Sequence, residues 1–552
     1  MFVSNAVDEA SLLSTWSDLL GDKKMAALKS GKGFSFYQLI FSNIDEEIFR
    51  CLYSEHILSS PNRPVNRLVG ALILQHQRNW SFSELASQLD YNIEIRVALG
   101  LKDFASQAFS MRTMFNFKNR LADYQSRTGI NLINQLFDSL TASQLKELKI
   151  KTGIQRGDTV MLNSNITSYS RLSLLVEILH RLYLSLTEAD QKAYSVWFSP
   201  YFKGGEKYVY EVKSQDNQSH LERLGMIYYG INLGLKEKYG DTETFQIFER
   251  AYQDHFKQVE TEDKAVIQVR PPAELDCHTL QSPDDTDATF KKKRQETYQG
   301  YSAFGVETCE PENEINLITH LSVHPNQTDD AAILAADLED MVEKTPDLNE
   351  CHVDGGFGSS AVDEQAEKHQ VNIIQTAVKG NVAKVTIKVE GNDEIGFTVT
   401  CPNPEQLPVR AIKLKKAYKA SFDLSKCENC PFKYDCPAKK NQVPTKGIAV
   451  FRFNQDIVLR QQRHKAILNI PKQRRTLRNG VENLMGLMHR GEKHTGKLKV
   501  RGLFNCTFYV FAMGIAINFE RIHRFYNHFF CFLCHLVLGR FTTLKSNALQ
   551  DN

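Results

Sequence analysis

Residues 315–377 alternate between short apolar runs and amphipathic stretches, and this alternation constrains the fold more than any other part of the chain. "INLITHLSVHP" predicts a strand, "DDAAILAADLEDMVEKT" a helix with an acidic N-cap, and "ECHVD" a buried strand. "SSAVDEQAEKHQ" and "VNIIQTA" predict one more helix and strand. Such alternation is typical of an α/β sheet, in which ligands bind beyond the carboxyl ends of strands. Asp354 is expected at such an end, followed at once by Gly355 and Gly356.

The N-terminal part, residues 1–150, predicts an all-α domain. In "PVNRLVGALILQHQRNWSFSELASQL" the apolar residues recur at helical spacing, and Ser81 and Ser83 indicate a new helix starting at Glu84. Two helices joined by a short polar turn are the outline of a helix-turn-helix DNA-binding unit, although many helical bundles share it. The sequence therefore leaves DNA contact by this domain open.

The rest of the chain predicts an interrupted α/β core. "RGDTVMLNSN" indicates a strand that opens the core, and "SRLSLLVEILHRLYLSL" and "LERLGMIYYGINLGLKEKYG" indicate helices. We expect the following parts: 151–380, the first part of the core, with a helical insert at about 165–265; 381–470, a small Cys-rich β insert; 471–538, basic and then apolar helices; and 539–552, a tail.

Charge is spread unevenly along the chain. The net charge of the 552 residues is only +2, but Arg460 to Arg501 contains twelve Lys or Arg against two acids, Glu482 and Glu492. A local basic tract is typical of a partner with a phosphate backbone, and a solvated basic face is the alternative.

The N-terminus has no basic segment leading into an apolar one, so no signal peptide is predicted. The most apolar stretch, Leu503 to Ile517, is shorter than the roughly 20 residues of a spanning helix, which favours a core helix. Eleven cysteines without a secretion signal indicate a reducing cytoplasm. We expect a cytoplasmic protein with no membrane partner, associated with the nucleoid if the basic tract binds DNA.

Three acids stand where they would share metal ions. Asp158 lies in or beside the first core strand, Asp354 at a later strand end, and Glu482 on a predicted helix. Each also has an ordinary explanation: a turn or cap at Asp158, and a helix salt bridge from Arg478 to Glu482. Carboxylate oxygens suit Mg²⁺, and two such ions can hold the attacking and leaving oxygens of a phosphoryl transfer. Gly355 and Gly356 would then let a nucleic-acid strand approach closely.

The cysteines of residues 401–436 predict a second metal site. "TCPNPEQ" and "CENCPFKYDCPAKK" contain a Cys-x2-Cys pair and two further cysteines: Cys401, Cys427, Cys430 and Cys436. Four cysteines fit a tetrahedral structural Zn²⁺ site, and free thiols are the alternative.

The order Asp158, Asp354, Glu482 resembles the DDE triad of bacterial insertion-sequence transposases. The resemblance extends to "DTVMLNSNITSYSRLSLLVEILHRL", "LQSPDDTDATFKKKRQETYQGY", "VDGGFGS" and "RNGVENLMGLMHRGEKHTGKLKVRGL", and covers roughly residues 40–525. It implies an RNase H-like α/β catalytic core and a two-metal mechanism with Mg²⁺ or Mn²⁺. It also implies cleavage of DNA at element ends, strand transfer into target DNA, and a homodimer on the terminal inverted repeats.

Many relatives carry Tyr-x2-Arg-x3-Glu-x6-Lys around the Glu. Here Arg478 and Glu482 match, whereas Arg475 and His489 stand at the Tyr and Lys positions. The residues expected to contact DNA are Arg475, Arg478, His489, Arg490, Lys493 and Lys497. Two alternatives stay open: an RNase H-like nuclease without strand transfer, and a catalytically inactive, domesticated DNA-binding protein.

Overall fold

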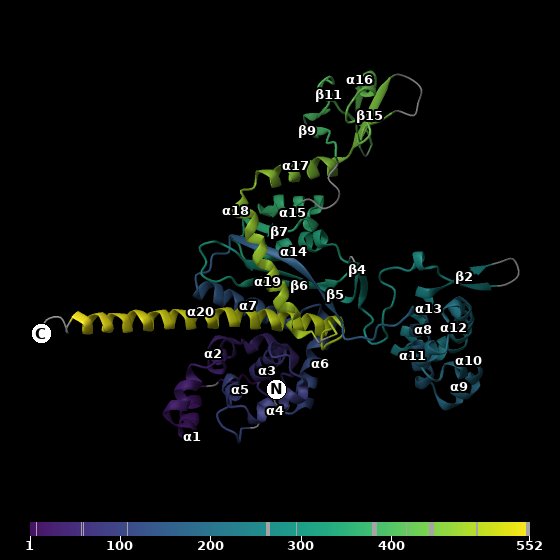
Figure 1. The fold of residues 1–552 in the computed structure, drawn as a ribbon. Coiled ribbons are helices and arrows are strands. Elements are labelled where there is room, and N and C mark those ends of the chain that lie inside the picture. The colour runs from purple at the N-terminus through teal and green to yellow at the C-terminus, as the bar shows by residue number, and fades with distance from the viewer. Residues whose placement is uncertain are drawn as a thin grey trace.

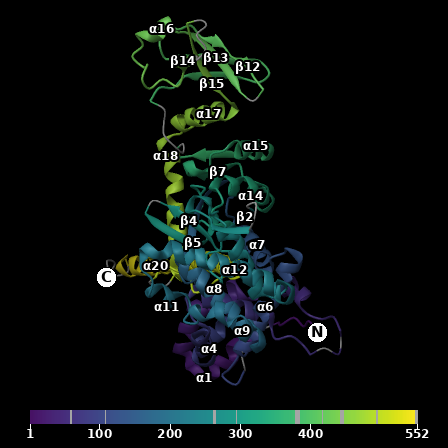
Figure 2. The same cartoon turned by 90° about the vertical axis from the view of Figure 1, so that its right-hand side faces the viewer.

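The computed structural model describes the whole chain except residues 7, 57, 59, 107–108, 261–264, 294, 378–383, 416, 441–446, 493–494 and 548–552. A mixed sheet lies at the centre, with the helical N-terminal region against one end of it and a small β-rich region projecting from the opposite end (Figures 1 and 2). A second group of helices lies beside the sheet, on the right in Figure 1. The protein is therefore of mixed α/β class.

All the regular elements described in the N-terminal region are helices. Helix α4 shows how the sequence sets its boundaries: the Ser81 side chain accepts from the Glu84 N–H, and the Glu84 carboxylate accepts from the Ser81 N–H. This capping box starts the helix at Phe82, two residues before the expected Glu84, because Glu84 is the third residue of the first turn. The elements are α1 Glu9–Lys29, α2 Lys32–Leu39, η1 Phe41–Asn43, η2 Glu46–Leu52, α3 Val65–Gln77, α4 Phe82–Tyr91, α5 Ile93–Ala98, α6 Met111–Thr128 and α7 Leu132–Glu147.

The central sheet has six strands in the order β4-β5-β1-β7-β8, with β6 also paired to β5. β5 runs antiparallel to β1, β4 and β6, whereas β1, β7 and β8 run parallel. The strands are β1 Ile154–Asn163, β4 Thr289–Lys293, β5 Glu296–Thr308, β6 Ile318–Pro325, β7 Glu350–Val353 and β8 Asn372–Gln375. All three parallel strands point their carboxyl ends to the same edge of the sheet.

Two helices cover one face of this sheet. α14 (Asp330–Lys344) connects β6 to β7, and α15 (Ser360–His369) connects β7 to β8 after the short turn η6 (Gly355–Phe357). The predicted succession of strand, helix, strand, helix, strand is confirmed. The apolar layer beneath these helices includes Phe304, Leu334, Val353 and Phe357, all fully buried.

The helices beside the sheet have their own apolar core, which includes Leu175, Tyr228 and Phe248. The helical insert expected at about 165–265 is mostly helical, but a hairpin of β2 (Phe256–Glu260) and β3 (Ala265–Val269) follows its last helix. Val259 and Val266 pair across this hairpin, and β-branched residues favour strands. The remaining elements are α8 Arg171–Ser185, α9 Glu188–Ala193, α10 Ser195–Phe198, η3 Ser199–Tyr201, α11 Gly205–Tyr210, η4 Ser214–Asp216, α12 Asn217–Tyr239, α13 Glu243–His255 and η5 Pro272–Glu274.

The projecting region consists of two small sheets, β11-β10-β9 and β12-β13-β15-β14. Its bounds differ from the expected 381–470, because helix α17 (Gln455–Asn469) already follows the last strand. The Asn454 side chain caps α17 by accepting from the Ile457 N–H. The elements are β9 Lys388–Asn392, β10 Gly396–Thr400, β11 Val409–Arg410, β12 Ile412–Lys413, β13 Tyr418–Asp423, α16 Ser425–Glu428, β14 Lys439–Lys440 and β15 Ile448–Phe453.

The chain then returns to the sheet through short turns and one long helix (Figure 1). The elements are α18 Lys472–Arg475, η7 Thr476–Gly480, α19 Val481–Met488, η8 His489–Gly491 and α20 Leu503–Asn547. α20 continues past residue 538, so the expected start of a tail there is wrong: no helix boundary falls at that point.

The first half of α20 is a core helix. Leu503–His528 is long and apolar enough to cross a membrane, but 78% of its most apolar window is buried inside the protein. Asn518 is nearly fully buried and satisfies the first residue of β6: its Oδ1 accepts from the Ile318 N–H at 2.8 Å, and its Nδ2 donates to the Ile318 carbonyl at 3.0 Å. A polar side chain in an apolar helix thus completes the hydrogen bonds of the sheet.

A buried histidine joins β6 to α14 and makes stability depend on pH. His320 lies 3.0 Å from Asp337 and 3.1 Å from Asp340. Burial would lower the pKa of His320, but the hydrogen bonds to both aspartates outweigh it, and the pKa is raised. Burial opposes ionisation of the aspartates too, yet hydrogen bonds, to His320 first, lower the pKa of each.

The contact of His320 with Asp337 and Asp340 is therefore predicted to stabilise the protein only within a limited range of pH. The contribution of His320 is present below its ordinary pKa of 6.5 and is lost as pH rises through the raised folded value. The contribution of the aspartates is present above their ordinary value of 3.8 and is lost as pH falls below it. We expect the unfolding temperature of the wild type to fall more steeply than that of His320→Gln as the pH rises above 6.5, measured by scanning fluorimetry. His56→Gln, at an exposed histidine, is the control; parallel profiles for wild type and His320→Gln would contradict the prediction.

Candidate active site

Asp158 is on β1, and Asp354 directly follows the neighbouring parallel strand β7. β1 and β7 pair with Ile154 opposite Glu350 and Arg156 opposite His352. The same register carried two residues further would place Asp158 beside Asp354, and the charge of Asp354 indeed acts on Asp158. Neighbouring strands lie about 4.8 Å apart. The strand order of the sheet is therefore what brings these two distant acids together.

Glu482 approaches the same face from α19. Val481, Leu484 and Met485 are buried, and α19 packs on β1 and β5. The Leu484 and Met485 side chains reach to 3.4 Å from where a Cβ on Gly305 of β5 would lie. Glu482 is not buried with them, and 67% of its side chain is exposed. Amphipathic packing thus fixes α19 on the sheet and leaves the carboxylate free to approach a ligand.

Arg478 stands between the first and the third acid. Its Nη2 donates to Asp158 Oδ2 and lies 3.5 Å from Glu482 Oε1. The helix salt bridge that was the ordinary explanation for Glu482 is present, but Arg478 binds Asp158 as well. Among the described residues, the oxygens of Asp158, Asp354 and Glu482 do not all lie within 4.8 Å of one another. The positive charge of the Arg478 guanidinium therefore lies close to both Asp158 and Glu482.

The electrostatics of Asp158 reflect this crowding. The pKa of Asp158 is raised to about 6: burial is the largest cause, the charges of Asp354 and Glu482 add to it, and Arg478 and the Thr159 N–H oppose it. The Thr159 N–H donates to Asp158 Oδ1 at 2.8 Å. A half-buried acid that senses two other carboxylates is in an environment that favours a bound cation.

Sequence reasoning missed a fourth acid beside Asp354. A Cβ at Gly356 would lie 2.8 Å from Asp354 Oδ1 and 3.2 Å from Asp330 Oδ2. The Gly356 N–H donates to Asp354 Oδ1 at 2.6 Å, and Thr159 Oγ1 donates to Asp330 Oδ1 at 2.9 Å. Gly356 thus leaves room for two carboxylates, an explanation that needs no nucleic acid. Asp330 begins a helix, so its sequence context indicated only a cap.

The other residues expected to contact DNA are placed differently from one another. Arg475 donates to the carbonyls of Ile467, Leu468 and Ile470 and so caps α17.

His489 Nδ1 lies 2.7 Å from Glu492, Lys497 Nζ donates to the Ile166 carbonyl at 2.7 Å, and Arg490 is exposed. Lys493 lies outside the described residues. Only Arg478 of this set contacts the acids of the site in the part of the chain that the structure describes.

The four candidate zinc ligands lie in the projecting region, each half-buried with a free thiol. Burial raises the pKa of Cys401 and of Cys427, and so does the proximity of other thiols, Cys430 and Cys436 among them. The four cysteines are therefore neighbours in space. Within the described residues, however, no three of their sulfurs lie all within 4.8 Å of one another.

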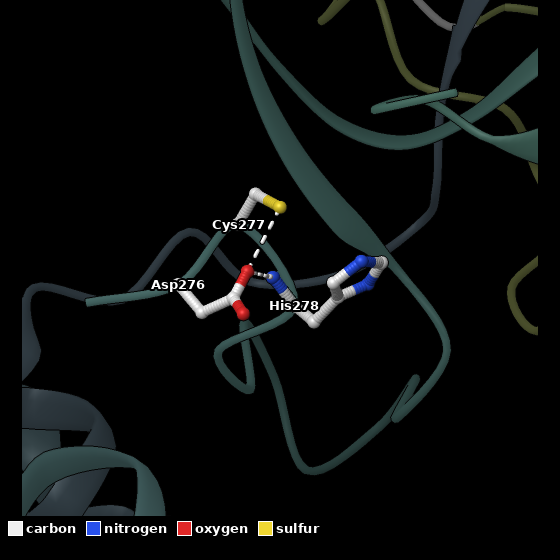
Figure 3. A group of neighbouring side chains, drawn as sticks. All are labelled: Asp276, Cys277 and His278. Carbon is white, nitrogen blue, oxygen red and sulfur yellow. Dashed lines mark hydrogen bonds between the residues drawn. The ribbon is translucent and has the colours of Figure 1, made fainter. Parts of the chain in front are cut away.

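One group of potential ligands is closer together, Asp276, Cys277 and His278 (Figure 3). Asp276 Oδ1 accepts from the Cys277 thiol at 2.9 Å and from the His278 N–H at 3.0 Å. These three consecutive residues form a hydrogen-bonded turn near the surface, which accounts for their proximity without a metal.

Acids at the carboxyl edge of a mixed sheet, faced by a basic turn, fit the class of α/β proteins that act on phosphate groups. Two family models narrow this class. A model described as a transposase domain (DUF772) matches residues 27–120, and a model described as a transposase DDE domain matches residues 400–523. Together they confirm the predicted similarity to DDE-type insertion-sequence transposases. The second match contains Glu482 and all four cysteines, whereas Asp158 and Asp354 precede it. No curated protein and no solved structure matches the chain.

Proposed function

We propose that this protein is a DNA transposase that cuts DNA at the ends of its element and joins the freed ends to target DNA by in-line phosphoryl transfer. The observation that carries the proposal is that Arg478 contacts both Asp158 and Glu482, while the charges of Asp354 and Glu482 both act on Asp158. The two transposase-domain matches, at opposite ends of the chain, support it.

We infer that the central sheet is RNase H-like. β6, β5 and β1 form an antiparallel series, and β7 and β8 continue it in parallel with β1. This arrangement puts one acid on the central strand and a second at the end of the adjacent strand. It supports the fold that the resemblance implies, and it explains why the third acid has to come from a helix lying across the sheet.

The donor set fits the divalent metal ions that DDE transposases typically use. Asp158, Asp354 and Glu482 would hold two Mg²⁺ or Mn²⁺ ions, since carboxylate oxygens are the ligands these ions prefer. When bound, the ions activate the nucleophile and neutralise charge at the reacting phosphate.

The residues of the chain then have separate tasks. The sheet register fixes Asp158 against Asp354, and α19 brings Glu482 from the other side. Arg478, now paired with Asp158 and Glu482, is well placed to bind a DNA phosphate once metal neutralises these acids, because guanidinium pairs with phosphate through two parallel hydrogen bonds. The N-terminal helices and the exposed Arg490 would contact DNA outside the reacting position.

The experiment that tests this proposal is incubation of the protein with Mg²⁺ and DNA carrying the element ends, comparing wild type with Asp354→Asn. Metal-dependent nicking that Asp354→Asn lacks supports phosphoryl transfer at this site. Joined products distinguish a transposase from a nuclease that only cuts. Binding without any cleavage would favour the inactive, domesticated DNA-binding protein. A transposase that acts on two element ends would bind them as a homodimer, and sizing of the protein–DNA complex tests this. Its place in the cell would be the nucleoid.

The Cys-rich region predicts a structural zinc ion. Burial first, and then the neighbouring thiols, raise the pKa of Cys401 and Cys427, and Zn²⁺ bound by Cys401, Cys427, Cys430 and Cys436 would stabilise the four thiolates. We expect about one zinc per chain in purified protein by elemental analysis, since four thiolates complete one tetrahedral site.

Cys430→Ser is expected to lose that zinc and to lower the unfolding temperature, whereas Cys51→Ser, at an exposed cysteine of the N-terminal region, keeps it. Zinc-free wild-type protein, purified without chelator, would overturn this assignment.

A further inference from the structure

We propose that Arg156 is a positioning residue that sets the place of Glu482. It acts by holding the turn η7, which carries Arg478 and leads into α19, against the central sheet. The inference rests on the proposed function, since it concerns the third acid of that site. Arg156 is on β1, two residues before Asp158, and its side chain is only 13% exposed.

The guanidinium of Arg156 is fixed from two sides. Its Nε donates to Glu307 Oε1 at 2.7 Å, and its Nη1 donates to the Leu477 carbonyl at 2.7 Å. Glu307, on β5, is completely buried and is bound on its other oxygen by Arg521 of α20. The sheet and α20 therefore hold the arginine, and the arginine holds η7.

The space around Gly480 shows how closely the Arg156 guanidinium packs against the turn η7. A Cβ at Gly480 would lie 2.2 Å from Arg156 Nη1 and 2.3 Å from Cζ, closer than any side chain can approach. The backbone of Gly480 has φ −66° and ψ −20°, which every residue adopts readily. Glycine is thus needed for space and not for conformation. The face of the guanidinium lies directly against the chain between Arg478 and Glu482.

One strand therefore determines two parts of the site. Asp158 is the first acid, and Arg156, on the same face of β1, fixes the turn η7, which carries Arg478 and leads into the helix that carries Glu482. The spacing between the first and the third acid then depends on Arg156 as well as on the packing of α19 against the sheet. Neither Arg156 nor Gly480 needs to touch metal or DNA for this role.

The test measures Mn²⁺ affinity of the full-length protein by isothermal titration calorimetry. Gly480→Ala displaces the turn, and Arg156→Lys replaces a fork that binds two partners with an amine that cannot span both. We expect each to weaken Mn²⁺ binding by about tenfold, the effect typical of residues that orient a ligand. Gly486→Ala is the matched control, because this glycine lies on α19 with open space around its Cβ position.

A double substitution separates positioning from general damage to the fold. In Glu482→Gln the third ligand is already lost, so adding Gly480→Ala should weaken Mn²⁺ binding no further. Full additivity of the two substitutions, or unchanged affinity in both Gly480→Ala and Arg156→Lys, would overturn the inference.

Should Gly480→Ala not fold, as judged by circular dichroism, Arg156→Lys alone decides, in the same double comparison with Glu482→Gln. Equal Mn²⁺ binding by wild type and Asp354→Asn is a different result: it would refute the proposed metal site itself.

Discussion

Asp354→Asn is expected to abolish metal-dependent DNA cleavage while leaving the protein folded. Asp354 follows the carboxyl end of β7 beside Asp158, and its Oδ1 accepts from the Gly356 N–H. Asparagine keeps the shape and this hydrogen bond but removes the negative charge that holds a divalent ion. A metal ion contributes several kcal/mol to stabilising the transition state, and each 1.36 kcal/mol is a factor of ten. The rate should therefore fall by about 10³-fold or more.

The measurement is the rate of strand nicking on DNA carrying the element ends, with Mg²⁺ and again with Mn²⁺. Asp347→Asn is the matched control, because this aspartate is exposed in the loop that precedes β7. It should cleave like the wild type. Cleavage by Asp354→Asn at the wild-type rate, in protein with an unchanged circular dichroism spectrum, would remove Asp354 from the catalytic set.

Glu307→Gln is expected to destabilise the central sheet by about 3–5 kcal/mol, the cost of breaking a buried ion pair from one side. Glu307 has no exposed surface and is bound by Arg156 and by Arg521, whose side chains are only 13% and 18% exposed. Glutamine has nearly the same volume, but it leaves two guanidinium groups without a counter-charge. The loss is therefore electrostatic and does not depend on creating a cavity.

Urea unfolding followed by circular dichroism measures this effect. Glu312→Gln is the matched control, since Glu312 pairs with Lys151 but is 67% exposed, and an exposed pair contributes at most about 1 kcal/mol. We expect the midpoint to shift for Glu307→Gln and to stay nearly constant for Glu312→Gln. Equal, small shifts in both variants would mean that water or the remaining side chains neutralise the two arginines.

The sequence predicts the α/β core well because local pattern and long-range topology agree there. β6, α14, β7, α15 and β8 each have a clear period and a clear boundary, and an α/β succession implies parallel neighbours. From this it follows that an acid at the end of β7 lies at the ligand-binding edge. Pairing of β1 with β7 cannot be read from either segment alone, because it depends on the order of all six strands.

Other features were missed for identifiable reasons. The hairpin of β2 and β3 has the linking sequence "TEDK", which lacks the glycine or asparagine of a tight turn. α17 is so polar that only Val458 and Ile467 are buried, so its helical period is faint.

Contacts between segments that are distant in the chain cannot be predicted from the sequence of either segment. Arg478 was paired with Glu482 at helical spacing, but its contact with Asp158 requires the turn η7 to lie on the sheet. The place of Asp330 beside Asp354 was not predicted, because Asp330 begins a helix and acids are common at helix starts.

The contact between Asp158 and Arg478 joins residues 320 positions apart. Chains are synthesised at about 5–20 residues per second, so roughly 15–60 s separate the emergence of β1 from that of the turn that reaches it. A ribosome-bound chain in this interval has the first acid but not the third. If the proposed site is correct, a nascent chain has no cutting activity until the segment that carries Arg478 and Glu482 has emerged and packed on the sheet.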